Sequence, residues 1–111
     1  MIVGIEMDFD AAHYLPNYEG KCKRLHGHTW HVKVEVIGNI QDNSGMVIDF
    51  GILKNELKEV LARFDHYRLN DVIANPTCEY VVTHIKAELL AKHINVLSVE
   101  VREGEGGWAR I

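Results

Sequence analysis

Apolar and polar residues alternate along the first third of the chain. Over residues 2–12, apolar side chains at every second position share one side: Ile5, Met7 and Phe9. Over residues 28–38 the same pattern recurs with Trp30, Val32, Val34 and Val36. A period of two is typical of strands with one buried face, so the pattern predicts two strands. The polar segment 16–24 between them is longer than a tight hairpin requires, and loops of this length often carry function.

Two stretches with helical periodicity follow. Residues 46–50 are expected to form a short extended piece that leads into a helix, with Asp49 as the residue that caps this helix. Apolar residues then recur three and four positions apart at Ile52, Leu53, Leu57, Val60, Leu61 and Phe64. The segment Asn75-Pro76-Thr77 offers two caps around a proline suited to a first helical turn. A second apolar stripe continues from it to about Lys92 through Val81, Val82, Ile85, Leu89 and Leu90. Two amphipathic helices are therefore predicted.

The last part of the chain returns to alternation. Over residues 95–102, one face carries Leu97, Val99 and Val101. Three glycines at 104, 106 and 107 provide a turn, and residues 108–111 are expected to form a short final strand. The order β-β-α-α-β-β favours an α+β fold, with one four-stranded antiparallel sheet and both helices on one face. We expect a single domain over residues 1–111.

A single sheet covered on one side leaves a second face and two edges. We expect the second face to carry Trp, Val and Ile side chains that no helix covers. Unpaired strand edges and exposed apolar surface both favour association. The pattern therefore predicts an oligomer.

Composition and charge narrow the class of protein. Apolar residues make up 47% of the chain, charged residues 25%, and there are 2 prolines, as in a globular domain. Twelve Lys and Arg against 16 Asp and Glu give a net charge of −4, which argues against nucleic acid or an acidic membrane as a partner, although a local basic cluster remains open. No apolar stretch is long enough to cross a membrane, and the first residues lack the pattern of a signal peptide. We expect a cytoplasmic protein whose two cysteines stay reduced.

Seven histidines stand out in this composition, and three of them have the spacing of metal ligands. In an extended chain, His26 and His28 project to one face about 7 Å apart. His13 ends the preceding strand, so an antiparallel neighbour would bring it to the same face. Three histidines with an open fourth position are typical of a catalytic zinc site. The alternative is that these are polar surface residues on a half-exposed strand, which is the better interpretation for a single histidine such as His31.

The other titratable residues give weaker signals. His84 and His93 lack partners at ligand spacing and are interpreted as solvated or capping residues. Cys22 lies beside Lys21, Lys23 and Arg24, and nearby cations favour the thiolate that acts as a base or nucleophile. It could equally be a fourth zinc ligand or a small loop residue. Cys78, at the start of the second helix, is interpreted as a packing residue.

Asp65 and His66 follow the first helix in a polar turn. An adjacent carboxylate and imidazole can relay protons if they face the metal, although the pair alone is a weak signal.

The motifs, taken in order, resemble those of the 6-pyruvoyltetrahydropterin synthase family. They are Phe9-Asp10-Ala11-Ala12-His13, Cys22-x-x-x-His26-Gly27-His28, Val47-Ile48-Asp49-Phe50, Asp65-His66-x-x-Leu69-Asn70, Asn75-Pro76-Thr77-x-Glu79 and Val99-x-Val101-x-Glu103. The resemblance covers essentially the whole chain. The spacing between Cys22 and His26 is most similar to the 6-carboxytetrahydropterin synthase branch of queuosine biosynthesis. Some other branches carry Glu directly after the cysteine or in its place, where this chain has Lys23.

The resemblance implies a tunnelling fold, in which the sheets of three subunits form a barrel and two trimers stack into a homohexamer. It implies that His13, His26 and His28 bind Zn²⁺ and that Cys22, Asp65 and His66 are catalytic, with Cys22 and the Asp-His pair coming from neighbouring subunits. Substrate-binding roles are implied for Glu103, which would anchor the pterin ring, and for Thr77. On residues alone, Glu103 is better interpreted as a solvated acid at the end of a strand.

The implied reaction converts 7,8-dihydroneopterin triphosphate to 6-carboxy-5,6,7,8-tetrahydropterin, acetaldehyde and triphosphate. Lys21, Lys23 and Arg24 are candidate neighbours of the triphosphate, because a polyanion needs local positive charge; a solvated basic loop is the alternative. Other open functions are a 6-pyruvoyltetrahydropterin synthase, a branch that produces 6-hydroxymethyldihydropterin, a non-catalytic pterin- or metal-binding oligomer, and a zinc hydrolase that does not need Cys22.

Overall fold

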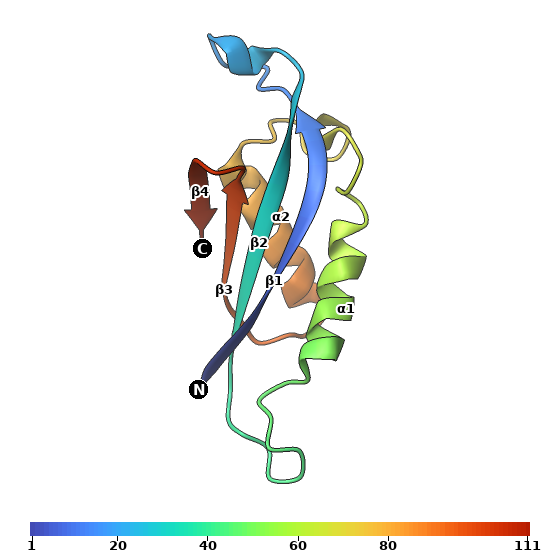
Figure 1. Ribbon diagram of the computed structural model, residues 1–111, viewed down its shortest axis with the longest axis vertical. Helices are drawn as coiled ribbons and strands as arrows, with labels where there is room; N and C mark the ends of the chain where they lie inside the picture. Colours follow the sequence, from blue (N-terminus) through green and yellow to red (C-terminus); the bar gives the residue numbers. More distant parts are fainter.

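The computed structural model describes residues 1–111 and has the predicted element order (Figure 1). The strands are β1 (Ile2–His13), β2 (His26–Ile37), β3 (Val96–Glu103) and β4 (Gly107–Arg110), and the helices are α1 (Phe50–Leu61) and α2 (Cys78–Ala91). Single 3-10 turns occupy Lys21–Lys23 and Leu69–Asp71. The strands form one antiparallel sheet in the order β1-β2-β3-β4, and both helices lie on one face of it. The predicted α+β fold is confirmed.

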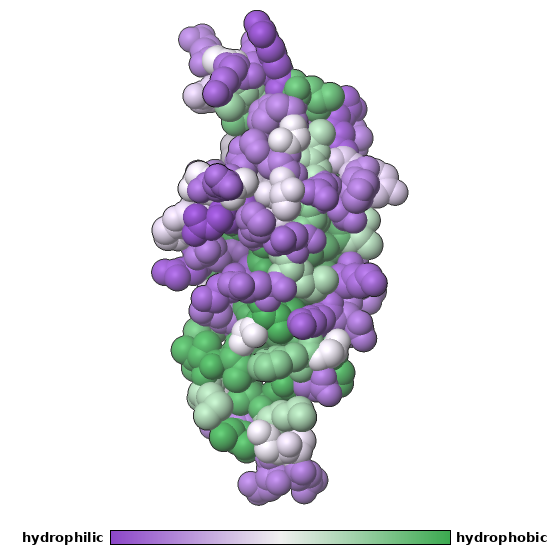
Figure 2. Space-filling view, in the orientation of Figure 1, coloured by the Kyte–Doolittle hydropathy of each residue, from purple (hydrophilic) through white to green (hydrophobic).

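The core lies between the sheet and the helices. Trp30, Val32, Val34 and Val36 of β2 are each no more than 3% exposed and pack with the apolar stripes of α1 and α2. This corrects the expectation that the uncovered face of the sheet would be apolar. That face is mainly polar (Figure 2), with residues such as Asp8, His31 and Lys33. Each strand alternates, so the single apolar face it offers is taken by the helices.

Exposed apolar side chains gather instead at the end of the molecule that holds the N-terminus. There Met1, Ile40, Met46 and Phe50, each about half exposed or more, line a groove of about 390 Å³. Figure 2 shows apolar surface at this lower end of the molecule. The bare apolar sheet face, one of the two grounds for expecting association of subunits, is absent. The other ground, the unpaired strand edges, remains, and association stays a prediction.

Both helices begin at the expected caps. Asp49 Oδ1 accepts hydrogen bonds from the backbone N–H groups of Gly51 (2.6 Å) and Ile52 (3.3 Å). The Thr77 hydroxyl accepts one from Tyr80 N at 3.4 Å. Pro76 precedes the cap of α2 and so lies outside the first turn, where it was expected. Residues 46–48 form no strand, although an extended segment was expected there.

Three apolar residues were wrongly assigned to buried faces. Ile52 in the first turn of α1 is 59% exposed and Leu90 near the end of α2 is 48% exposed. Leu97 is 39% exposed because a β-bulge shifts the pairing of β2 and β3 between Glu35 and Val36. Val96, 8% exposed, packs inward in place of Leu97.

The candidate residues collect at one end of this 53 Å long molecule. His13 ends β1, His26 begins β2 and Glu103 ends β3, so the antiparallel topology brings these three positions to the same end. The N-terminus of α2 lies at the same end, because the carbonyl of Pro76 contacts His13. None of the helices has the length and apolar character needed to span a membrane.

Candidate metal centre

The pairing of β1 with β2 places the three predicted histidines on one face of the sheet. His13 pairs directly with His26, and Ala11 pairs with His28. Since successive side chains alternate between faces, the three rings lie on the face covered by the helices. The ring centroids are 4.6 Å apart for His13 and His26, 4.9 Å for His26 and His28, and 5.2 Å for His13 and His28. The predicted convergence of the three imidazoles is confirmed as geometry.

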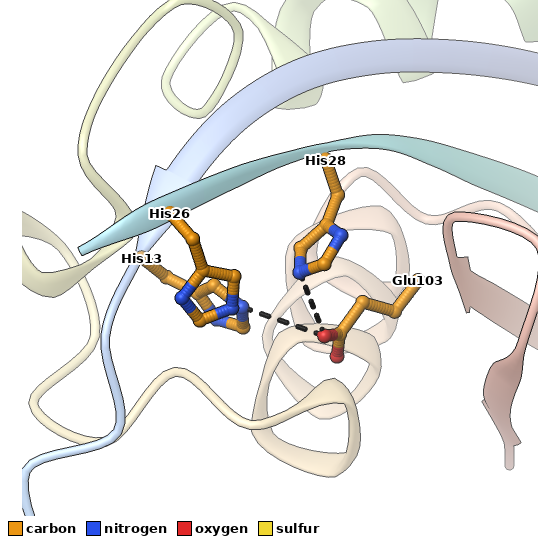
Figure 3. Close-up of side chains that lie close together, drawn as sticks. All are labelled: His13, His26, His28 and Glu103. Atoms are coloured by element: carbon orange, nitrogen blue, oxygen red, sulfur yellow. Dashed lines mark ion pairs between the residues drawn. The ribbon is translucent and has the colours of Figure 1, made fainter. Parts of the chain in front are cut away.

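Glu103 completes this cluster (Figure 3). It pairs with Trp30 on β2, two residues beyond His28, and its Oε1 lies 2.9 Å from His28 Nε2 and 3.5 Å from His13 Nε2. The four side chains point toward one another, and one ligand atom from each lies within 4.8 Å of all the others. Glu103 therefore contacts the candidate metal ligands, a position that its end-of-strand location alone did not indicate.

Backbone carbonyls contact the Nδ1 atoms of two of the rings. His13 Nδ1 is 2.8 Å from Pro76 O, and His26 Nδ1 is 2.7 Å from Arg24 O. A carbonyl accepts only, so each Nδ1 carries the proton and each Nε2 is left with a free lone pair. This arrangement is the one by which proteins orient histidines toward a metal ion.

Burial favours the neutral form of the third ring. The pKa of His28 is lowered from its ordinary value, chiefly by burial and further by the nearby His13 and His26, while Glu103 opposes the shift. Neutral imidazole is the form that binds metals. The contacts with His13, followed by His28 and His26, hold the pKa of the Glu103 carboxyl below its ordinary value, so this side chain is an anion at neutral pH.

Two buried nitrogen atoms of the cluster have no hydrogen-bond partner within the protein. His13 Nε2 and His28 Nε2 are the buried side-chain polar atoms of the protein that make no hydrogen bond, since Glu103 lies close to both but out of hydrogen-bond alignment. Buried polar atoms without a partner are uncommon and costly. The three imidazole nitrogens alone form a donor set suited to a catalytic zinc ion, which keeps its fourth position open. The cluster therefore fits a bound zinc ion.

Asp65 and His66 form a second cluster, next to β1. Asp65 Oδ1 accepts a hydrogen bond from Asp10 N (3.0 Å) and lies 3.0 Å from His66 Nδ1, while His66 N donates to Asp10 O (2.6 Å). His66 has a left-handed backbone with φ of 62°, which these contacts hold in place. The hydrogen bond from Asp10 is the main reason that the pKa of Asp65 is lowered. The His66 side chain is 78% exposed, so the pair faces solvent.

The two clusters share no residue within one chain. Asp10, Asp65 and His66 group together, separately from His13, His26, His28 and Glu103. His28 and His66 nevertheless both line one open hollow of about 520 Å³. A single chain therefore presents the proposed metal ligands and the Asp-His pair beside each other without joining them.

Cys22 and Thr77 both lie outside the histidine cluster. Cys22 belongs to the 3-10 turn Lys21–Lys23 and is absent from both clusters. The Thr77 hydroxyl caps α2, directly after the Pro76 carbonyl that contacts His13. Cys78 donates to Val101 O at 3.2 Å, and burial raises the pKa of its thiol to about 11, in keeping with the predicted packing role.

The remaining histidines take no part in either cluster. His31 points to the open face and pairs with Asp8 at 2.6 Å, and His84 packs edge-on against Phe64.

Asn70 is a residue whose role sequence reasoning missed. Its side chain accepts a hydrogen bond from Tyr14 N (3.0 Å) and donates one to Tyr14 O (2.9 Å). Tyr14 directly follows His13, so Asn70 ties the end of β1 to the segment after His66. The signal in the sequence was the spacing Asp65-His66-x-x-Leu69-Asn70, which carries no information about the partner.

Comparison with known proteins identifies the family. The family model described as 6-pyruvoyl tetrahydropterin synthase matches residues 2–111. The chain belongs to the 6-pyruvoyl tetrahydropterin synthase family.

Within the 6-pyruvoyl tetrahydropterin synthase family, curated relatives carry a more specific name. A protein of Archaeoglobus fulgidus, provisionally named 6-carboxy-5,6,7,8-tetrahydropterin synthase, is 46% identical over 111 residues, which cover 100% of this chain and 95% of that protein. The 6-carboxy-5,6,7,8-tetrahydropterin synthase of Synechocystis is 41% identical over 110 residues, covering 92% of this chain and 85% of the relative. Both confirm the resemblance to this branch.

Solved structures of the family share the fold. The structure of Caenorhabditis elegans 6-pyruvoyl tetrahydropterin synthase matches with a TM-score of 0.85 and 27% identity, covering 100% of this chain and 95% of that one. Plasmodium falciparum 6-pyruvoyl tetrahydropterin synthase matches with a TM-score of 0.77 at 24% identity over 100% and 96% of the two chains. The chain therefore has the subunit fold of the tunnelling-fold proteins in this family.

Proposed function

We propose that this protein is a zinc-dependent 6-carboxytetrahydropterin synthase. It would convert 7,8-dihydroneopterin triphosphate and water to 6-carboxy-5,6,7,8-tetrahydropterin, acetaldehyde and triphosphate. The names of the Archaeoglobus and Synechocystis relatives support this branch. The observation that carries the proposal is the convergence of His13, His26 and His28 with two unpartnered buried Nε2 atoms.

His13, His26 and His28 would hold the zinc ion through their Nε2 atoms. The carbonyls of Pro76 and Arg24 already fix the tautomers of His13 and His26, so neither of these two rings has to turn over before binding. When bound, zinc supplies a Lewis acid that polarises substrate hydroxyl groups and acidifies the adjoining C–H bonds. His13 is fully buried, which holds the ligand set rigid at the base of the site.

Cys22 would remove a proton from the substrate side chain, and His66 would exchange protons on the other side, oriented by Asp65. The 3.0 Å contact between Asp65 Oδ1 and His66 Nδ1 leaves Nε2 of His66 facing solvent for this exchange. Within one chain the Asp-His pair and the histidine cluster are separate. We therefore propose that the pair acts on a substrate held by a neighbouring subunit, in a homohexamer built from two trimeric barrels.

Glu103 and Thr77 would bind the pterin ring. A carboxylate can accept two parallel hydrogen bonds from an amino-pyrimidine edge, and the lowered pKa of Glu103 keeps it ionised for this purpose at neutral pH. Thr77 caps α2 beside the same cluster. Its hydroxyl is one residue from Pro76, whose carbonyl contacts His13.

The test is acetaldehyde release from 7,8-dihydroneopterin triphosphate by zinc-loaded protein. Cys22→Ala should lose turnover by at least about a hundredfold, the lower range for removal of a general base, while retaining zinc. Cys78→Ala is the matched control and should stay active, because Cys78 packs against Val101 and carries no proton-transfer role.

Full acetaldehyde release by zinc-loaded Cys22→Ala would overturn the role of Cys22 as the base. A zinc hydrolase would instead release no acetaldehyde with either the wild type or this variant. Mixing Cys22→Ala with His66→Ala subunits tests the interface, since a site shared between neighbours regains part of its activity in mixed oligomers.

A further inference from the structure

The loop that joins β1 to β2 carries an unpaired positive charge cluster. Six of the twelve Lys and Arg side chains meet an acidic partner, such as Arg63 with Glu88 and Lys92 with Glu56 and Glu59. The basic side chains without any ion pair or hydrogen bond are Lys21, Lys23, Arg24, Lys54 and Lys58. Three of them fall within one four-residue segment, and the only acidic residue between positions 14 and 25 is Glu19.

This segment is an ordered part of the fold. Leu15 N donates to Cys22 O (2.9 Å), Lys23 N to Gly20 O (3.1 Å) and Arg24 N to Lys21 O (3.0 Å). Gly20 has φ of 151°, and a Cβ there would lie 2.8 Å from the Tyr18 ring, so glycine allows the close turn. Lys21, Lys23 and Arg24 are exposed on this framework. The backbone that carries the three charges is therefore ordered before any ligand binds.

The loop adjoins the histidine cluster. Arg24 O is the acceptor for His26 Nδ1, and Lys23 is three residues from His26, so their Cα atoms are at most about 11 Å apart. In Figure 1 this loop projects beyond the ends of β1 and β2, at the end of the molecule where His13 and His26 lie. A ligand held at the histidine cluster can therefore extend an anionic tail toward these three cations.

We propose that Lys21, Lys23 and Arg24 form the binding site for the polyphosphate chain of the substrate. The inference rests on the proposed function for the identity of the substrate and adds the residues that hold its triphosphate. Several cations on one short segment match an anion that carries several charges, and an arginine can bind phosphate oxygens in pairs. Three cations on a protein of net charge −4 are too few for a nucleic acid duplex, which takes about six to ten phosphate contacts.

The first test uses inorganic triphosphate alone as the probe, with binding to the zinc-loaded protein measured by calorimetry. The double variant Lys21→Gln/Lys23→Gln should bind at least about tenfold more weakly and lose most of the salt dependence of binding. The variant Lys54→Gln/Lys58→Gln is matched in charge and also removes two unpaired exposed lysines, on α1, and should bind as the wild type does. Circular dichroism and zinc content should be the same for all three proteins. Equal binding by both variants, or no binding by the wild type at low salt, overturns the site.

The second test separates this inference from the proposed function. With 7,8-dihydroneopterin triphosphate, Lys21→Gln/Lys23→Gln should raise KM at least about tenfold relative to Lys54→Gln/Lys58→Gln. An unchanged KM with normal product overturns the triphosphate site and leaves the function standing. Loop-dependent binding of inorganic triphosphate without any pterin product supports the anion site and refutes the proposed function.

Discussion

The two hydrogen bonds between Asn70 and Tyr14 form a clamp beside His13, and they offer a sharp test of how the fold positions the histidines. Asn70 satisfies both the N–H and the C=O of Tyr14, at 3.0 and 2.9 Å, next to His13. Each partly buried hydrogen bond contributes about 1 kcal/mol. Asn70→Ala removes both, so the free energy of unfolding should fall by about 2 kcal/mol. Asn70→Asp keeps the acceptor but lacks the donor, and should lose about 1 kcal/mol or slightly more.

Urea denaturation of the zinc-free protein measures these losses, and competition with a chelator measures zinc affinity. Asn70→Ala should also bind zinc about tenfold more weakly, because the end of β1 that carries His13 is no longer held. Asn95→Ala is the control. It removes a single bond to Ile37 O (2.8 Å), outside the site, and should cost about 1 kcal/mol with unchanged zinc affinity. If Asn70→Ala matches Asn95→Ala in both stability and zinc affinity, the clamp does not position His13.

Three further predictions follow from local environments. Iodoacetamide at pH 8 should label Cys22 before Cys78. Burial raises the pKa of the Cys78 thiol to about 11, so only about one Cys78 side chain in a thousand is a thiolate at this pH. Peptide mass spectrometry measures the order of labelling, and faster labelling of Cys78 contradicts the prediction. Asp65→Asn should lower stability at pH 7 in urea denaturation. The folded-state pKa of Asp65 lies below the ordinary value of 3.8, so the difference should begin to shrink as the pH falls through 3.8 and be gone below the folded-state pKa; a difference independent of pH refutes this. Thr77→Ala should cost about 1 kcal/mol through loss of the α2 cap, and Thr77→Ser should restore most of it in the same assay.

The alternation of the sequence was enough to predict the histidine cluster. A period of two fixes which side chains share a face, and a strand order of β-β requires His13 to approach His26 and His28 once the strands pair. The cap at Asp49 could be predicted from the sequence, and that of α2 was narrowed to Asn75 or Thr77, because capping depends on residues within one turn.

The features that were missed depend on contacts between distant segments. Glu103 contacts the histidines because of the register in which β2 and β3 pair. That register contains a β-bulge, which the local sequence pattern did not predict. The same bulge exchanged Leu97 for Val96 in the core. Asn70 meets Tyr14 across 56 positions of sequence. The second face of the sheet was expected to carry uncovered Trp, Val and Ile side chains, but alternation places these residues on the one face that the helices cover.

The most direct test of the central claim is mass spectrometry of the pterin formed when zinc-loaded protein is incubated with 7,8-dihydroneopterin triphosphate. The proposed function predicts 6-carboxy-5,6,7,8-tetrahydropterin together with acetaldehyde. The pyruvoyl compound or 6-hydroxymethyldihydropterin would contradict this product assignment while keeping the family. Unchanged substrate, with zinc bound, would contradict the claim that the histidine cluster and the Asp65-His66 pair together form a pterin-converting site.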